Sequence, residues 1–279
     1  MYPDFKRVIV RFLDIGPERT ADLIQKVVQM DESLAHKILT QTLREFSRRH
    51  RNLTRTYKDH YVEAVKIAGS EIQELEEISE DKKMLIGSYL SKEYSISSAA
   101  FFNPSMVESP DQTGLEDGSK RVIISFRATG EGHISSIVFH TGVIDRNNQI
   151  HIEKAGHHVD QPEAIKRHVY EKKMTIEKLQ EMDVRQDIIS AVLDPLNDTF
   201  IYGEFLGSAL NVLKDSSLNE EERRAVEQIV WLADSHYEIS FSRDTHLSER
   251  VIFPISYTER RGIEDARFVR FVGEDGKVT

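Results

Sequence analysis

The chain contains no cysteine among its 279 residues. Disulfide bonds and thiolate metal sites are therefore excluded, and nothing in the fold depends on an oxidising compartment. Long apolar runs are absent as well. Asp4, Lys6 and Arg7 interrupt the N-terminal stretch, which lacks the continuous apolar segment of a secretory signal. No later segment approaches the roughly 20 apolar residues of a membrane span. These absences predict a soluble, cytoplasmic protein with no membrane partner.

Basic residues are in the minority. Lys and Arg number 37 and Asp and Glu number 47, which gives a formal net charge of −10. A general nucleic-acid-binding protein needs a basic surface, so this balance predicts no nucleic-acid partner. One local basic patch, Arg48–Arg51, is interpreted either as a solvated helix end or as a contact for a phosphate or an acidic neighbour. A helical interaction module built on residues 1–80 and this patch stays open as an alternative function.

Several familiar catalytic and cofactor motifs are missing. The sequence has no P-loop, no HExxH zinc motif, no GxSxG nucleophile elbow and no paired CxxC. The GEG sequence at 130–132 begins like a dinucleotide fingerprint, but Ser135 stands where the third glycine is needed. His157, His158 and His168 match no standard zinc spacing. We therefore expect no metal and no organic cofactor.

Apolar periodicity divides the chain into helical and strand-rich stretches. Helical spacing covers the N-terminal part, with Asp31 as the expected N-cap of one helix and Gly69 as the end of another. Helical patterns return between about 161 and 234. We therefore predict a helical N-terminal region at residues 1–80 and a second domain at residues 81–279 that carries this helical insertion.

Short strands separated by tight turns fill the remainder. The strands expected from the pattern are 121–127, 133–139, 150–152, 237–241, 251–255 and 267–272. Successive antiparallel strands of this length form the meander of a propeller blade, but a closed propeller needs about four or more blades and roughly half that number is visible. The expected fold class is mixed and mainly antiparallel β, in part of a five-bladed β-propeller. The chain is accordingly expected to be the N-terminal part of a longer protein.

Two polar stretches have the composition of a ligand site. In the first, Asn103 stands beside Pro104, whose fixed φ at a strand start can aim the amide at a ligand hydroxyl. An ordinary Asx-Pro turn is the alternative. In the second, Arg127, Glu131 and His133 surround two glycines, which let a ligand approach the backbone at a hairpin tip. A plain polar hairpin loop explains this stretch equally well.

A third stretch, RGIEDAR at 261–267, places two acids between two arginines. Side chains alternate along a strand, so Asp265 would share a face with Arg267 while Glu264 points the other way. Arg267 favours an ionised Asp265, whereas a general acid needs a proton to give. On the residues alone, a salt bridge is therefore a sound interpretation.

Three motifs occur in order along the chain, namely FNPS at 102–105, SFR at 125–127 and GIEDAR at 262–267. Together they resemble glycoside hydrolase family 130, the β-mannoside phosphorylases and β-mannosidases. The last motif is similar to the family's Glu-Asp-Pro-Arg, with Ala266 in place of Pro. The resemblance implies a five-bladed β-propeller with a sugar site at its central channel, of which this chain holds the N-terminal portion.

The resemblance also implies roles for individual residues. Asp265 corresponds to the general acid, which passes its proton through a hydroxyl of the bound mannose to the glycosidic oxygen. The substrate-binding side chains, matched by motif or expected at the same mouth, are Asn103, Ser105, Arg127, Glu131, His133, Glu264 and Arg267.

Two reactions remain open at this stage. In the family's phosphorylases, inorganic phosphate attacks with inversion and gives α-mannose 1-phosphate, whereas other members use water. The phosphate-binding residues are expected beyond Thr279. The predicted function is therefore cleavage of β-mannosidic bonds in an oligosaccharide by phosphorolysis or hydrolysis, with phosphate as an optional co-substrate. A non-catalytic sugar-binding or scaffold protein on the same fold is the alternative, and a homo-oligomeric state stays open.

Overall fold

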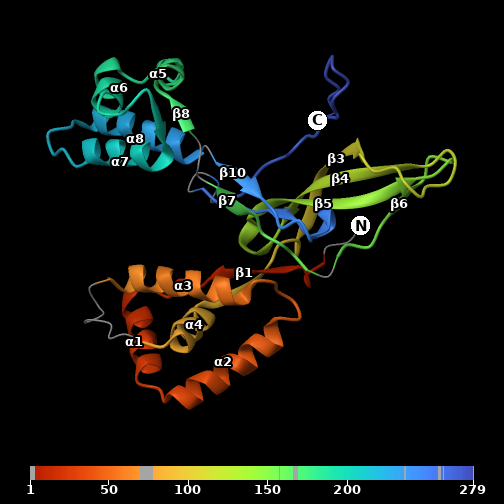
Figure 1. Cartoon of the computed structure of the whole chain (residues 1–279), viewed down its shortest axis with the longest axis horizontal. Coiled ribbons are helices and arrows are strands. Elements are labelled where there is room, and N and C mark those ends of the chain that lie inside the picture. The colour runs from red at the N-terminus through yellow and green to blue at the C-terminus, as the bar shows by residue number, and fades with distance from the viewer. Residues whose placement is uncertain are drawn as a thin grey trace. The chain divides into compact units, whose positions relative to one another are not determined.

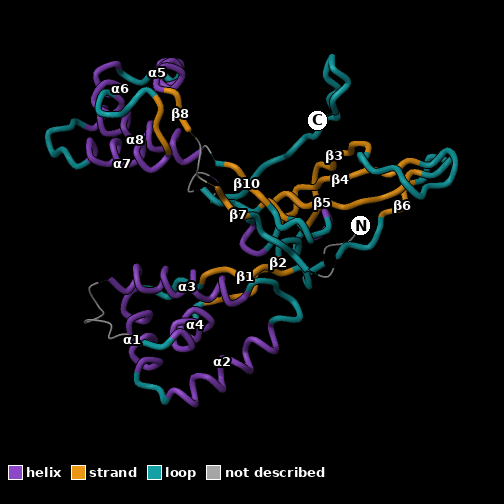
Figure 2. The backbone as a smooth tube through the Cα atoms, viewed as in Figure 1, coloured by secondary structure: helices purple, strands orange, loops and turns teal. Residues whose placement is uncertain are grey.

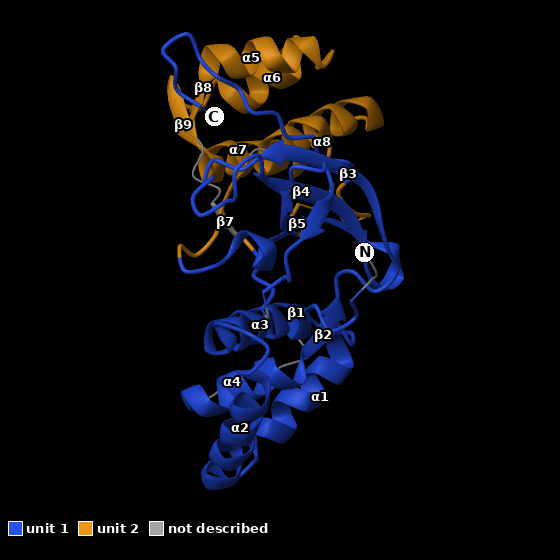
Figure 3. Ribbon diagram, turned by 90° about the vertical axis from the view of Figure 1, so that its right-hand side faces the viewer, with its two compact units in different colours: residues 1–161, 244–252, 264–279 blue, residues 162–243, 253–263 orange. Residues whose placement is uncertain are grey.

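The computed structural model describes residues 4–69, 78–156, 158–165, 169–235, 237–256, 259 and 261–278. Figure 1 labels the helices and strands, and Figure 2 colours them by type. The chain divides into two compact units. Unit 1 holds residues 1–161, 244–252 and 264–279, and unit 2 holds residues 162–243 and 253–263 (Figure 3).

The N-terminal part of unit 1 is one strand followed by a group of helices. These elements are β1 (Val8–Phe12), α1 (Pro17–Val28), α2 (Glu32–Phe46), α3 (Leu53–Ala68) and α4 (Glu80–Tyr89). Asp31 caps α2 by accepting hydrogen bonds from the backbone N–H groups of Ser33 and Leu34. Gly69 ends α3 at a φ of +48°, which glycine adopts most readily. Both predicted helix ends are confirmed.

A single apolar core holds the four helices together. Its fully buried members include Ile24, Ala35, Ala64, Leu85, Ile86 and Leu90. Helix α4 approaches α3 closely at Gly87, where a Cβ atom would lie 1.8 Å from the carbonyl oxygen of Tyr57. Only glycine permits that distance, so this one residue fixes how α3 and α4 pack.

The second part of unit 1 contains a five-stranded antiparallel sheet. Its strands are β3 (Ala100–Glu108), β4 (Lys120–Thr129), β5 (Ser135–Ile144), β6 (Ile150–Ile152) and β11 (Val251–Ile252). Strand β2 (Ser91–Ser95) precedes this sheet in the chain. Strand β2 pairs with β1 in a separate two-stranded sheet. Strands β3, β4 and β5 form a meander, and both β11 and β6 pair with the other edge of β5.

The strand register gives this sheet two distinct faces. Arg127 of β4 pairs with Ile137 of β5, and Ile124 pairs with His140. Because paired residues share a face and neighbours alternate, Arg127 and His140 project to opposite sides. We call these sides the Arg127 face and the His140 face.

The buried side chain of Arg7 closes the His140 face. Its Nη2 donates to the carbonyl oxygen of Ser248 at 2.5 Å, and its Nη1 lies 3.5 Å from Nε2 of His140. Phe101 and Phe126 contact the His140 ring edge-on at centroid distances of 6.0 and 5.8 Å. Burial, and then the positive charge of Arg7, lower the pKa of His140 to about 4. The part of this face around His140 is therefore buried in the core.

Unit 2 is mainly helical. Its elements are β7 (Glu163–Ile165), β8 (Val169–Glu171), α5 (Lys172–Glu181), α6 (Gln186–Leu193), β9 (Thr199–Ile201), α7 (Tyr202–Leu213), α8 (Glu220–Ser235) and β10 (Glu238–Ser240). Strand β8 pairs with β9, and β7 pairs with β10. Tyr170 stacks on Phe200 at 5.6 Å within the core of this unit, and burial raises the pKa of Tyr170 to about 12.

The predicted strand at 267–272 is wrong. Residues 264–271 have no regular secondary structure, and hydrogen bonds from the backbone N–H groups of Gly273 and Gly276 form a turn at 273–277. Val272 forms an isolated bridge with Val278 across that turn. A strand forms only where a neighbouring backbone accepts its hydrogen bonds, and within the described residues no strand pairs with 267–271.

The expected fold class, mainly antiparallel β in part of a five-bladed β-propeller, is also wrong. Helices hold more residues than strands do, so the chain is mixed α and β. Across the part of the chain that the structure describes, the sheets have two or five strands and none is closed or propeller-like. The meander ends after β5 because β6 has three residues and the chain then leaves the sheet for unit 2 before β11 returns.

Candidate functional site

A bulge in edge strand β3 redirects the side chain of Asn103. The register between β3 and β4 shifts between Phe102 and Ser105, and Asn103 adopts a φ of +48°. Pro104 follows and has no backbone N–H to give to a ladder. Bulges commonly re-aim a side chain in this way. The Asn103 side-chain amide consequently points out of the strand pattern and reaches Asp265.

Asp265 is the centre of the resulting cluster. Its Oδ2 accepts a hydrogen bond from Nδ2 of Asn103 at 2.5 Å. Nε of Arg127 lies 3.4 Å from Oδ1, and Nη2 of Arg267 lies 3.9 Å from Oδ2. One amide and two guanidinium groups therefore surround a single carboxylate. The Asp265 side chain keeps 32% of its surface exposed, so it can meet a ligand from solvent.

Side-chain tethers hold the 264–271 segment against β3. Nη1 of Arg267 donates to the carbonyl oxygen of Asn103 at 2.8 Å, and the backbone N–H of Phe268 donates to Oγ of Ser105 at 3.4 Å. The Phe268 ring also packs edge-on against Phe139 on the Arg127 face, with centroids 5.6 Å apart. These contacts position Asp265 without a strand ladder.

Arg127 contacts both Phe102 and Asp265. Its guanidinium lies over the ring of Phe102, 5.4 Å from the ring centroid. Its Nε is shielded from solvent and is close enough to Asp265 for an ion pair, but the angle is not that of a hydrogen bond. We regard the contact as an electrostatic one, because the charges are opposite and the distance is short. Within the described residues this Nε therefore has no hydrogen-bond acceptor.

Three predicted site residues are not joined to Asp265 by any contact among the described residues. Glu131 binds β2 instead, because its Oε1 accepts from the backbone N–H of Ser95 at 3.3 Å. His133 ends the short 3₁₀ turn η2 (Glu131–His133) between β4 and β5 and is exposed. Glu264 is exposed beside Asp265. The structure thus gathers Asn103, Ser105, Arg127, Asp265 and Arg267, and leaves these three apart.

The two glycines of the hairpin tip have different surroundings. A Cβ atom on Gly130 would lie 2.4 Å from the carbonyl oxygen of Ser95 and 2.7 Å from the hydroxyl of Tyr94. The backbone that approaches Gly130 is therefore β2 and not a ligand. Gly132 has a φ of +63° and open space around its Cα. The expectation that both glycines admit a ligand fails at Gly130.

A buried acidic site was not predicted from the sequence. Glu249 belongs to the short turn η3 (Leu247–Glu249), and its carboxylate accepts from Nη2 of Arg51 at 3.0 Å. Backbone N–H groups of His158 and His246 donate to the same carboxylate at 3.4 and 3.3 Å. Burial raises the pKa of Glu249, but these hydrogen bonds and the charge of Arg51 outweigh that effect and the net shift is downward.

The basic patch at Arg48–Arg51 is largely paired within the chain. Arg49 and His50 both contact Oε1 of Glu93, at 2.8 and 2.7 Å. Arg51 contacts Glu249, which is 198 positions away. The acidic neighbours considered for this patch therefore lie in unit 1 itself. No local sequence signal connects residues so far apart.

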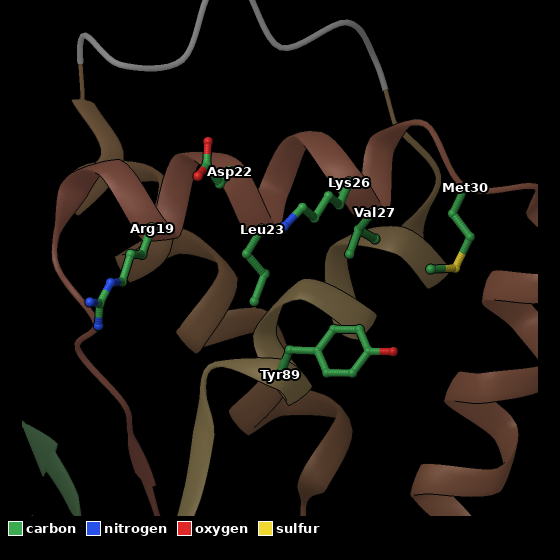
Figure 4. A pocket seen from close by; sticks show the side chains of 7 residues that line it. All are labelled: Arg19, Asp22, Leu23, Lys26, Val27, Met30 and Tyr89. Carbon is green, nitrogen blue, oxygen red and sulfur yellow. The ribbon is translucent and has the colours of Figure 1, made fainter.

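A surface pocket of about 430 Å³ lies on α1 (Figure 4). Its lining residues are Arg19, Asp22, Leu23, Lys26, Val27, Met30 and Tyr89. None of the residues predicted to form the functional site lines this pocket. Its apolar lining includes Leu23, Val27 and Met30 of the N-terminal helical region, and it shares no residue with the Asp265 cluster.

A metal-ligating group and a membrane-spanning helix are both absent from the residues that the structure describes. There, no group of three or more His, Asp and Glu side chains is placed to hold a metal ion. His157 and His168 lie outside the described residues, and His158 contacts Glu249. Within the same described ranges, every helix is too short or too polar to cross a membrane.

Comparison of the chain with protein-family models, curated proteins and solved structures finds no match.

Proposed function

We propose that the Asp265 cluster binds the mannosyl unit and supplies the proton in an enzyme that cleaves β-mannosidic bonds. One observation carries the proposal. Asn103 and Asp265 stand 162 positions apart and share a hydrogen bond of 2.5 Å, with Arg127 within 3.4 Å of the same carboxylate. These are the residues that the resemblance to glycoside hydrolase family 130 selects, and the resemblance uses no information about their spatial position.

The chemistry of the cluster suits a sugar ligand. A carboxylate accepts hydrogen bonds, guanidinium groups donate them and an amide does both, so together they match the vicinal hydroxyls of a pyranose. In the proposed reaction, Asp265 gives its proton to a mannose hydroxyl, which gives its own proton to the glycosidic oxygen. The bond from C1 to that oxygen then breaks, and the electron pair goes to the leaving oxygen.

Phosphate or water attacks C1 from the opposite side, so the configuration at C1 is inverted, and the proton that the attacking phosphate or water then releases returns through solvent to Asp265. With phosphate the product is α-mannose 1-phosphate, and with water it is free mannose. Arg127 and Arg267 stabilise the Asp265 carboxylate that remains after the proton has left. The proposal includes a cytoplasmic location and requires no metal or organic cofactor.

The test uses this chain and the longest form in which the protein occurs. Each is incubated with β-1,2- and β-1,4-linked mannobiose, with and without inorganic phosphate, and the products are separated by chromatography. Mannose 1-phosphate that forms only with phosphate indicates a phosphorylase, and free mannose without phosphate indicates a hydrolase. A sugar that binds without any product would favour the non-catalytic binding protein.

A pair of variants assigns the proton donor. We expect Asp265→Asn to lower turnover by about 10²- to 10⁴-fold, the usual contribution of a general acid. Asp275→Asn, in the turn at 273–277, is the matched control because it removes a neighbouring acid outside the cluster. Equal turnover in the wild type and in Asp265→Asn would remove Asp265 from the mechanism.

A further inference from the structure

Phe102 is an exposed aromatic residue beside the Asp265 cluster. It precedes Asn103 in β3 and pairs with Arg127 of β4, so its ring lies on the Arg127 face. The residue keeps 44% of its surface exposed, although the guanidinium of Arg127 lies over the ring at 5.4 Å. Arg127 thus contacts both the Phe102 ring and the Asp265 carboxylate, and part of the ring stays open to solvent.

The other large apolar residues nearby have different surroundings. Phe268 packs against Phe139 and its backbone is tethered to Ser105, so it has a structural explanation. Met106 pairs with Ile124, which places it on the His140 face. Phe102 therefore combines an exposed ring with the Arg127 guanidinium over it, and it directly precedes Asn103 in the chain.

Elementary stereochemistry says which sugar such a ring suits. In a β-mannopyranoside the hydrogens at C1, C3 and C5 are axial and form one apolar face, while the axial hydroxyl at C2 points to the opposite side. In the α-anomer the oxygen at C1 is axial and interrupts that apolar face. Polarised C–H groups pack favourably on the negative face of an aromatic ring. A flat ring beside polar groups thus favours the β-anomer.

We propose that Phe102 is the stacking platform for the mannopyranose ring and the residue that selects β- over α-mannosides. This inference rests on the proposed function, because it assumes that the Asp265 cluster holds the mannosyl unit. Asn103, Arg127 and Asp265 bind the hydroxyl rim of the sugar, and Phe102 covers the face formed by the hydrogens at C1, C3 and C5.

The test measures binding and not turnover. Dissociation constants for methyl β-mannoside and methyl α-mannoside are determined by titration calorimetry for the wild type, Phe102→Leu, Phe102→Tyr and Met106→Leu. Leucine keeps an apolar side chain but removes the ring, and Met106 is the matched control because it is equally exposed on the same strand but on the other face.

We expect Phe102→Leu to weaken binding of the β-anomer about tenfold, to change the α-anomer little and so to remove the preference for β. Phe102→Tyr and Met106→Leu should keep the wild-type preference. An unchanged preference in Phe102→Leu, with the β-anomer still bound, overturns the platform alone. Failure of the wild type to bind either anomer overturns both the platform and the proposed function. Wild-type binding with a preference for the β-anomer, together with no product in the mannobiose incubation described above, overturns only the catalytic proposal.

Discussion

Glu249 and Asp265 are two carboxylates of unit 1 that arginine side chains contact. Glu249 is buried, whereas Asp265 is partly exposed to solvent. The side chain of Glu249 is 4% exposed and receives hydrogen bonds from Arg51 and from two backbone N–H groups. The side chain of Asp265 is 32% exposed and is reached by side chains alone. The buried carboxylate has all its partners inside the protein and serves stability. The exposed one retains free acceptor capacity, which is what a ligand requires.

The most disruptive test of this comparison is Glu249→Ala. The substitution leaves the Arg51 guanidinium and two backbone N–H groups without their acceptor, and breaking a buried pair in this way costs about 3–5 kcal/mol. The free energy of unfolding, from urea titration at pH 7, should fall by that amount. Glu249→Gln keeps the shape of the side chain and one acceptor oxygen, so its free energy of unfolding should lie between those of the wild type and Glu249→Ala. A loss below about 1 kcal/mol in Glu249→Ala would show that Glu249 is not a structural acid.

The second test concerns His140, a buried titratable group on the face of the sheet opposite to Arg127. His140 is buried with a pKa of about 4, below the ordinary value of 6.5. It is neutral in the folded protein, so between pH 6.5 and pH 4 the unfolded chain binds more protons than the folded one does. The free energy of unfolding therefore falls as the pH is lowered through this window, by up to about 3 kcal/mol, and the contribution is fully present above pH 6.5.

Urea titrations at pH 7.0, 5.5 and 4.5 measure this loss. Other groups also titrate in the same range, so the wild type is compared with His140→Gln, which cannot gain a proton. The difference between the two slopes isolates His140. Parallel slopes would mean that His140 is not held neutral in the folded state.

The third test separates the two glycines of the hairpin between β4 and β5. Gly130→Ala brings a methyl group to 2.4 Å from the Ser95 carbonyl, and we expect a loss of about 1–3 kcal/mol for this overpacking. The methyl group of Gly132→Ala meets open space, so the expected loss of stability comes only from the positive φ and is about 1 kcal/mol. Melting temperatures of the two variants rank these losses, and the reverse order would contradict the close contact with β2.

The smallest expected effect on stability belongs to Asp265. Its ion pairs are partly exposed, and such pairs contribute roughly 0.2–1 kcal/mol. In the same urea titration, the free energy of unfolding of Asp265→Ala should therefore lie within about 1 kcal/mol of the wild-type value, whereas that of Glu249→Ala should not. A large destabilisation by Asp265→Ala would mean that the cluster is a structural brace and would weaken the case for a ligand site.

Local signals in the sequence predicted the features that depend on neighbouring residues. The Asp31 cap and the end of α3 at Gly69 each follow from a side chain or a φ angle acting on its own segment. Strand β4 was predicted for the same reason, because its alternation is local. The 267–272 segment has similar β-forming residues, but a ladder requires a partner that sequence periodicity does not reveal.

Local sequence patterns did not predict the contacts between residues that lie far apart in the chain. Arg7 meets Ser248 across 241 positions, and Arg51 meets Glu249 across 198. Neither pair has a local pattern, so the buried charged groups of unit 1 were missed. Asn103, Arg127 and Asp265 were named together only because their motifs resemble those of a family. Periodicity, composition and spacing alone gave no reason to place them side by side.

The separation between Asn103 and Asp265 also has a consequence for biosynthesis. A ribosome adds roughly 5–20 residues per second, so on the order of ten seconds pass between the synthesis of one residue and that of the other. During this interval the helices and strands β3 to β5 leave the exit tunnel and can fold, but the carboxylate that completes the cluster does not yet exist. The cluster is therefore completed only after strands β3 to β5, which support it, have been synthesised.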